Sequence, residues 1–185
     1  MSHRAIVVTT LASTALVVSP ACFDHAPAFI WNASASVPIG LYRLAPAEHL
    51  HIGDYVVVSP PEPLAAFLAG RGYLARGVPL IKRVLALAGA TVCRRGATII
   101  AYDHGFGEAR ERDRLGRPLP SWQGCRMLAE SEVFLMNWDA PDSLDGRYFG
   151  PLPVTSIVAH ALPLWTDADG DGHFQWHFGD LTDAP

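Results

Sequence analysis

The chain has 185 residues, of which fourteen are basic and eighteen acidic, so its formal net charge is −4. This length suits a single compact unit with one core and leaves little room for two independent domains. The sequence lacks a run of basic residues interleaved with aromatic residues, and we therefore expect no nucleic-acid partner.

The N-terminus has the pattern of an export signal: Arg4 is followed by an uncharged stretch from Ala5 to Val18. Fourteen residues are fewer than the ~20 that a membrane-spanning helix needs, although residues 19–23 extend the stretch. Small residues before Cys22 fit a cleavage point. We expect residues 1–23 to form a hydrophobic helical segment that is either cleaved or kept as a membrane anchor; a buried core helix is the alternative.

Short elements follow, because fifteen prolines and sixteen glycines interrupt the rest of the chain. A short helix is expected from Pro63 to Ala69, with proline in its first turn and Gly70 at its end. Apolar and β-branched runs predict strands at residues 40–44, 55–59, 80–87, 98–102, 133–137 and 156–163. The fold class predicted is therefore mainly β.

The segment 94–123 is more polar and more charged than its flanks and resembles an inserted flap. We expect a β core formed by residues 24–92 and 130–185, with residues 93–129 as an inserted cap. Cys93 and Cys125 flank this segment, and a disulfide between them would stabilise the fold by roughly 3 to 4 kcal/mol in the chain-entropy model. Free buried thiols are the alternative, and Cys22 is a weak candidate for lipid attachment.

Lys82 is the only lysine in a chain that has thirteen arginines. Arginine serves wherever only a positive charge is needed, but lysine can lose its proton when it is buried and arginine effectively cannot. In a strand, Lys82 shares a face with the apolar residues Leu80, Val84 and Ala86. Arg83 points to the other side. Burial lowers the pKa of a lysine from ~10.4, and a fall of roughly three units makes it a base near neutral pH.

Two serines one residue apart, Ser34 and Ser36, stand in the stretch NASASVPIGLY at residues 32–42. Pro38 and Gly40 predict a turn that exposes a hydroxyl and lets a substrate backbone approach. Serine needs an adjacent base to become a nucleophile, and serine with lysine is a known variant of the catalytic triad. One hydroxyl would attack while the other donates a hydrogen bond to the developing oxyanion. A purely structural turn is the alternative.

A third stretch, NWDAPDSLDGRYFGPLP at residues 137–153, is a polar turn cluster between two predicted strands. Its side chains suit the orientation of a base or the closure of a hydrogen-bond network. By composition alone, a tight loop capped by aspartates is the better explanation.

Together these stretches resemble the type I signal peptidase superfamily, and specifically the TraF-type conjugative transfer signal peptidases, which are Ser-Lys peptidases of the S26 family. Four boxes carry the resemblance in family order from Asn32 to about Leu164, namely NASASVPIGLY, GDYVVV, IKRVLALAG and DSLDGRYFGPLP. The resemblance implies a signal-peptidase or LexA-like β catalytic core with an inserted cap and an N-terminal hydrophobic helix.

The resemblance also implies a role for each residue in these boxes. Ser36 would be the nucleophile, and Ser34 would contribute its hydroxyl to the oxyanion hole. Lys82 would be the general base, and Ser143 would orient its amine. Asp145 would brace the loop together with the arginine two residues later. A single residue separates Ser36 from the proline where general signal peptidases usually have two, which favours the conjugative branch and leaves the choice between the two serines open.

The function implied is a membrane-associated serine endopeptidase of the inner membrane, with its catalytic domain facing the periplasm. Its substrate would be a pilin precursor, hydrolysed or cyclised, and type IV secretion or conjugation components would be further partners. The alternatives are a general type I signal peptidase that removes signal peptides from exported preproteins, a non-catalytic pilin-binding secretion component, and an autocleaving repressor-type protease. The export segment and the absence of a DNA-binding half disfavour the last of these.

DADGDG, residues 167–172, copies the opening of a calcium loop, but Phe178 occupies position twelve, where a bidentate glutamate is required. An exposed acidic turn is the better interpretation. The two histidine pairs, 49 with 51 and 173 with 177, imply no third ligand. We therefore expect no metal site and no cofactor.

Overall fold

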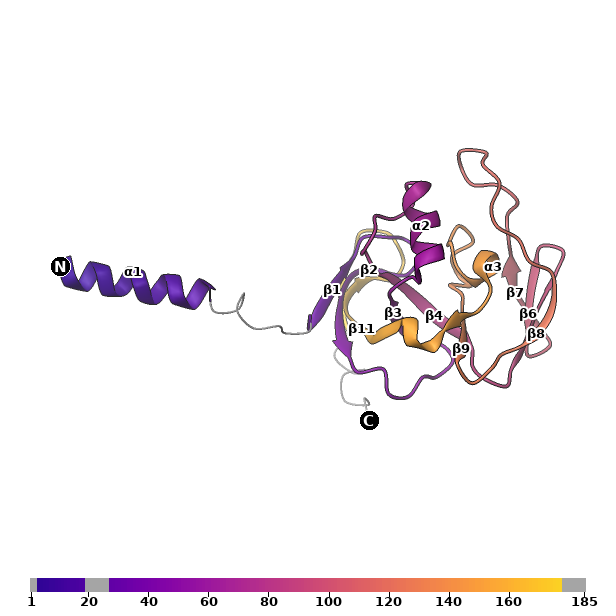
Figure 1. The fold of residues 1–185 in the computed structure, drawn as a ribbon, viewed down its shortest axis with the longest axis horizontal. Coiled ribbons are helices and arrows are strands. Elements are labelled where there is room, and N and C mark those ends of the chain that lie inside the picture. The colour runs from indigo at the N-terminus through magenta and orange to yellow at the C-terminus, as the bar shows by residue number, and fades with distance from the viewer. Residues whose placement is uncertain (1–2, 19–26, 178–185) are drawn as a thin grey trace.

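The structure is a computed structural model that describes residues 3–18 and 27–177 (Figure 1). The first element, α1 (His3–Val18), is a helix of 16 residues that carries the predicted export segment. In the described part of the chain, no helix combines the length and the apolar character needed to cross a bilayer. The predicted cleavage point and Cys22 lie outside the described residues.

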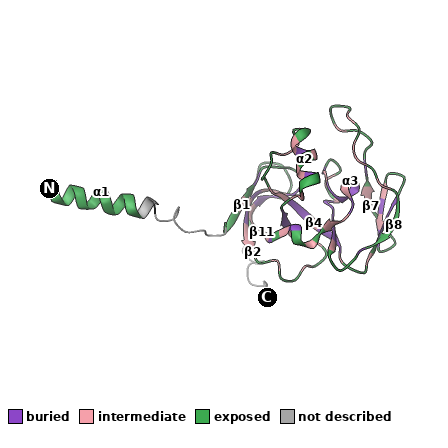
Figure 2. Cartoon of the chain, viewed as in Figure 1, coloured by how far each residue is buried: buried purple, intermediate pink, exposed green. Residues whose placement is uncertain are grey.

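The larger sheet contains eight strands, and every pair of neighbouring strands in it is antiparallel. Its order is β1-β2-β11-β3-β4-β9-β10, and β12 pairs with β11. The strands are β1 (Phe29–Asn32), β2 (Ile39–Ala45), β3 (Tyr55–Val58), β4 (Leu80–Ala86), β9 (Glu132–Leu135), β10 (Leu152–Pro153), β11 (Ile157–Asp167) and β12 (Gln175–Trp176). Figure 2 shows that buried residues gather along the central strands of this sheet.

A second, four-stranded sheet has the order β7-β6-β5-β8. Its strands are β5 (Thr91–Arg95), β6 (Thr98–Ala101), β7 (His104–Glu108) and β8 (Gly124–Met127). Cys93 and Cys125 occupy paired positions on β5 and β8, and the structure joins them in a disulfide, the pair expected from the sequence. The sheet begins two residues before the segment 93–129 predicted as an inserted cap, and the domain division itself stays a prediction.

Hydrophobic packing unites the two sheets. One buried cluster contains Leu85 and Phe134 from the larger sheet together with Val92 and Ile99 from the smaller one. Two further clusters lie within the larger sheet, one around Tyr42 and one around the valines of β3 and β4. Burying a side chain of this size contributes roughly 1.5 to 3 kcal/mol, so these clusters fix the strands that carry the site.

The described helices outside the N-terminal segment are short. α2 (Glu62–Gly70) has proline near its start and ends at Gly70, as predicted. α3 (Gly146–Phe149) is a single turn whose N-cap is Asp145, and the carboxylate of Asp145 accepts a hydrogen bond from the backbone N–H of Arg147. A 3₁₀ turn, Val154–Ser156, precedes β11.

All six strands predicted from the sequence are present, and the mainly β fold class is confirmed. β11 runs four residues beyond its predicted end at 163. The sequence did not predict β1, β5, β7, β8, β10, β12 or α3. Several of these elements are very short or lie in the polar segment, where apolar periodicity is weak.

Candidate active site

The loop between β1 and β2 presents the two serines. The side-chain amide of Asn32 lies 2.7 to 3.1 Å from the carbonyls of Ser34, Val37 and Pro38, and its Oδ1 accepts from the N–H of Ser34 at 3.1 Å. The hydroxyl of Tyr42 donates to the carbonyl of Pro38 at 2.7 Å. A buried asparagine therefore holds both ends of the loop, and the serines stand on a fixed backbone.

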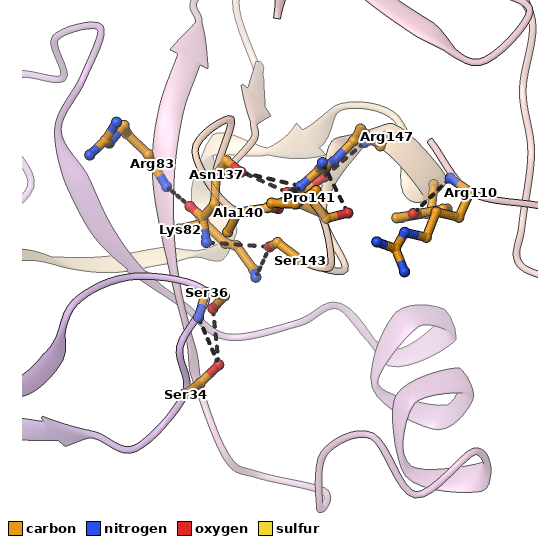
Figure 3. A network of polar contacts seen from close by, with 12 residues as sticks. Ser34, Ser36, Lys82, Arg83, Arg110, Asn137, Ala140, Pro141, Ser143 and Arg147 are labelled. Carbon is orange, nitrogen blue, oxygen red and sulfur yellow. Dashed lines mark hydrogen bonds and ion pairs between the residues drawn. The ribbon is translucent and has the colours of Figure 1, made fainter. Parts of the chain in front are cut away.

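The two serines contact each other directly. The hydroxyl of Ser34 donates to Ser36 Oγ at 3.1 Å, and the backbone N–H of Ser36 donates to Ser34 Oγ at 3.3 Å (Figure 3). The Ser34 hydroxyl, which the resemblance assigns to an oxyanion hole, and the Ser36 N–H, a second donor, thus lie together beside Ser36 Oγ.

Lys82 lies on β4, opposite Val56 of β3, and only 5% of its surface is exposed. Burial lowers the pKa of Lys82 from 10.5 to about 8; the carboxylate of Asp145 opposes this shift and the guanidinium of Arg147 adds to it. The direction is the one expected from the sequence. A substantial fraction of this amine is therefore neutral near pH 8 and available as a base.

The amine of Lys82 is oriented by the loop that follows β9. Its Nζ donates to Ser143 Oγ at 2.9 Å, and Asn137 Nδ2 donates to the same oxygen at 3.4 Å. Asn137 Oδ1 in turn accepts the backbone N–H of Arg83 at 2.8 Å. Asn137 therefore links β4, which carries Lys82, to the loop that carries Ser143.

A buried ion pair braces this loop. Both carboxylate oxygens of Asp145 accept from the guanidinium of Arg147, at 2.9 and 2.8 Å, and Arg147 is 1% exposed. The same guanidinium donates to the carbonyls of Asn137 at 3.2 Å and Ala140 at 2.6 Å. Because every charge of the pair is hydrogen-bonded, the loop from 137 to 147 has one defined shape.

One cavity of about 500 Å³ brings together four of the five predicted side chains: Ser34, Ser36, Lys82 and Ser143 line it, and Asp145 does not. Figure 3 shows the serine loop facing the pair formed by Lys82 and Ser143. In the described part of the chain, no hydrogen bond joins Ser36 directly to Lys82. Catalytic hydrogen bonds are often long without substrate and shorten when the substrate closes the site.

Two positioning residues were not predicted as such. Asn32 opens the stretch 32–42 and Asn137 opens the stretch 137–153, yet no role was assigned to either. The available signal was an asparagine at the start of a polar turn, which is common in turns that have no catalytic role.

Arg83, next to Lys82 in β4, lies apart from the amine. Its guanidinium stacks on Tyr55 and Trp138, with ring centroids 4.7 and 4.4 Å away, and binds Asp139 at 2.6 Å. This placement agrees with the predicted alternation of side chains along the strand.

The acidic turn and the histidines were considered as metal ligands. Asp167 accepts the backbone N–H groups of Gly170 and Gly172 at 2.8 and 2.9 Å, which makes it the cap of a turn. Phe178 lies outside the described residues. Within residues 3–18 and 27–177, no three or more His, Cys, Asp or Glu side chains are placed to hold a metal ion.

Comparison with known protein families gives one match over most of the chain. The family described as signal peptidase, peptidase S26, matches residues 2–165. These residues include both serines of the loop, the lysine of β4 and the braced loop after β9.

Among individual proteins, the chain is 34% identical over 147 residues to the plasmid transfer protein TraF of Escherichia coli, covering 73% of this chain and 81% of that protein. It is 32% identical over 147 residues to the probable conjugal transfer protein TraF of Sinorhizobium fredii, covering 74% and 77%. It is also 32% identical over 117 residues to the probable signal peptidase I-1 of Synechocystis, covering 62% and 55%. A solved signal peptidase I from Enterococcus faecalis matches with a TM-score of 0.37 and 17% identity, covering 61% of this chain and 97% of that one.

Proposed function

Since the chain belongs to the S26 family of signal peptidases, we propose that it is a membrane-associated serine endopeptidase that processes an exported precursor, in which Ser36 is the nucleophile and Lys82 the general base. The relatives named for plasmid and conjugal transfer support a peptidase-related role in conjugation. On this proposal the substrate is a conjugative pilin precursor.

The observation that carries the proposal is the state of the single lysine. Its amine is buried, its pKa is lowered to about 8, and it lies with Ser34 and Ser36 on the wall of one cavity. A structural lysine would gain nothing from a site that removes its charge, whereas a general base requires such a site.

The geometry supports a two-step acyl transfer. Neutral Lys82 takes the proton of Ser36 as Oγ attacks the scissile carbonyl carbon, and the oxyanion receives hydrogen bonds from Ser34 Oγ–H and Ser36 N–H. The lysine then passes this proton to the leaving amine as the C–N bond breaks, which leaves an ester on Ser36. Water or an amine attacks the ester, and the lysine accepts a proton from that nucleophile and returns one to Ser36.

Two features support a periplasmic location for the catalytic body. The α1 helix carries Arg4 in its first turn and is uncharged from Ala5 to Val18, as in export signals, and the pair Cys93–Cys125 suits an oxidising compartment. On the proposal the N-terminal segment directs the chain to the inner membrane, and components of the conjugation machinery are its neighbours.

The test expresses the full chain in membranes together with the pilin precursor and follows processing on gels. Ser36→Ala and Lys82→Arg are expected to abolish cleavage, the latter because arginine keeps the charge but cannot act as a base. Ser34→Ala is expected to slow cleavage by about a hundredfold or more, since it removes one oxyanion donor. Ser121→Ala, on an exposed loop, is the matched control and is expected to cleave like the native chain.

Three outcomes would change the proposal. Normal processing by Lys82→Arg would overturn the assignment of the base. Loss of cleavage in Ser34→Ala with full cleavage in Ser36→Ala would exchange the roles of the two serines. Processing of secretory preproteins in place of the pilin would identify a general signal peptidase instead. The mass of the product separates hydrolysis from cyclisation, because a linear pilin is heavier by one water.

A further inference from the structure

A second cavity, of about 310 Å³, lies beside the candidate active site and is rich in positive charge. Five arginines line it together with two aspartates, a formal excess of three positive charges in a chain whose net charge is −4. We call it the arginine pocket; its arginines are Arg71, Arg110, Arg112, Arg114 and Arg117. Such a local excess favours an anionic ligand.

The arginines of this pocket are held in place by the surrounding chain. Arg110 and Arg114 both bind the carboxylate of Asp142, at 2.6 and 2.7 Å. Arg117 binds Asp113 at 2.6 Å, and the hydroxyl of Tyr73 donates to the same carboxylate. These contacts fix the loop that carries four of the five arginines against the end of α2 and against the loop that contains Ser143.

Two guanidinium groups have no carboxylate partner among the described residues. Arg71 donates to the carbonyl of Pro118 at 3.0 Å, and Arg112 donates to the carbonyl of Gly116 at 2.7 Å. A guanidinium carries five N–H donors, so most donors of both groups stay available to a ligand. Planar, bidentate binding of carboxylates is what arginine does best.

The arginine pocket adjoins the cavity of about 500 Å³ that holds Ser36 and Lys82. Tyr73, Asp142 and Leu144 line both. Arg114 also lines a third cavity of about 460 Å³, together with Ser34, Ser36 and Ser143. A polypeptide bound across Ser36 therefore has a direct route to the arginine pocket.

From this placement we propose that the arginine pocket binds a carboxylate of the protein substrate, close to the scissile bond, and thereby selects among substrates. The proposal rests on the proposed function and deepens it. The carboxylate has two sources in a polypeptide, an aspartate or glutamate side chain and the chain terminus, and both present the same anion to the guanidinium groups. A phosphate-bearing ligand is disfavoured because the pocket opens onto a peptide cleft.

The experiment uses synthetic peptides that span the processed junction of the pilin precursor, with glutamate placed in turn at each position within about four residues of the scissile bond and glutamine as its isostere. Further peptides end in a free carboxylate or a carboxamide. At one or two adjacent positions, or at the terminus, the peptide with the carboxylate is expected to have a kcat/KM about fivefold higher than its amide counterpart. This preference is expected to weaken at high salt.

Variants then link this preference to the pocket. Arg71→Gln and Arg112→Gln are each expected to move the ratio of kcat/KM for the carboxylate peptide to that for the amide peptide towards one, and the double variant is expected to bring it to one. Arg95→Gln removes the same charge from an exposed position on β5 outside the pocket and is expected to keep the ratio. The same pairs of peptides are measured for binding to the full-length Ser36→Ala chain by fluorescence anisotropy, where a similar fivefold preference is expected.

The two proposals fail in different ways. If the native chain cleaves the carboxylate and amide peptides with equal kcat/KM at every position, the carboxylate pocket is wrong and the proposed peptidase activity is retained. Absence of cleavage by the native chain would overturn the peptidase, and the binding arm would still decide the pocket. Displacement of bound peptide by millimolar inorganic phosphate, with no preference for the acid, would assign the pocket to a phosphate ligand instead.

Discussion

Replacing Lys82 by methionine is expected to stabilise the folded protein near neutral pH while abolishing cleavage. Lys82 is 5% exposed, and its amine donates a hydrogen bond to the neutral hydroxyl of Ser143. A protonated amine in this position is poorly compensated for the water it loses. Methionine fills the same space without a charge.

The magnitude follows from the pKa of Lys82, which is about 8 in the folded chain against 10.5 as the reference value. Below about pH 8 the lysine is protonated in both the folded and the unfolded chain, and burial destabilises the fold by ~3 kcal/mol. As the pH rises from about 8 to about 10.5, the folded chain has released the proton while the unfolded chain still binds it. The free energy of unfolding therefore rises with pH, by roughly 2 to 3 kcal/mol between about pH 7 and about pH 10.

Chemical denaturation of the full chain across this pH range tests the reasoning. The difference between the native chain and Lys82→Met isolates the lysine, because the other groups titrate in both proteins. The native chain is expected to gain stability towards high pH, and the difference from the variant is expected to shrink with the same slope. A difference that does not change with pH would refute the lowered pKa and, with it, the case for a neutral base.

Three further predictions follow from the same structure. The cleavage rate of the native chain is expected to rise with pH and reach a plateau above about 8, because only neutral Lys82 accepts a proton; a rate that is flat between pH 6 and 9 would contradict this. Arg147→Met leaves Asp145 buried without its partner and is expected to lower the free energy of unfolding by ~3 to 5 kcal/mol in denaturant titrations, whereas a loss below ~1 kcal/mol would show the pair to be unimportant. Gly40→Ala places a Cβ 2.2 Å from a carbonyl oxygen of β11 and is expected to lower the free energy of unfolding by ~2 to 4 kcal/mol. Gly53→Ala is the control, because φ is also positive there but the space is open, and it is expected to cost ~1 to 2 kcal/mol. Equal losses in the two variants would show that backbone strain alone, and not the contact with β11, sets the effect.

The residues proposed to carry the chemistry were the most predictable part of the sequence. A lone lysine in an apolar strand indicated a buried amine, and Lys82 is buried with the lowered pKa that this implies. The serine pair was located by its turn residues, and Gly40 has the positive φ and the close backbone contact that only glycine tolerates. Each of these signals is local, since it depends on one residue and its immediate neighbours.

The long-range contacts were beyond the reach of the sequence alone. Nothing in the pattern of Gly124–Met127 marks it as a strand, because all four residues are exposed and the pairing with β5 is what orders them. Asn137 joins β4 to Ser143 only because the register of β4 and β9 brings these segments together. The arginine pocket likewise combines the end of α2 with a loop whose contacting residues lie 46 and 47 positions later, and composition had indicated only a polar inserted flap there.

The buried pair Asp145–Arg147 bears on the protonation state of Lys82, the proposed base. Asp145 and Arg147 influence the amine in opposite directions, so hydration decides how readily it holds its proton. A polypeptide bound across the cavity would cover the remaining exposed part of Lys82 and lower the pKa of its amine further. On the proposed mechanism, binding of the substrate would therefore raise the neutral fraction of the Lys82 amine at a given pH, so that the chain gains its base as it gains its substrate.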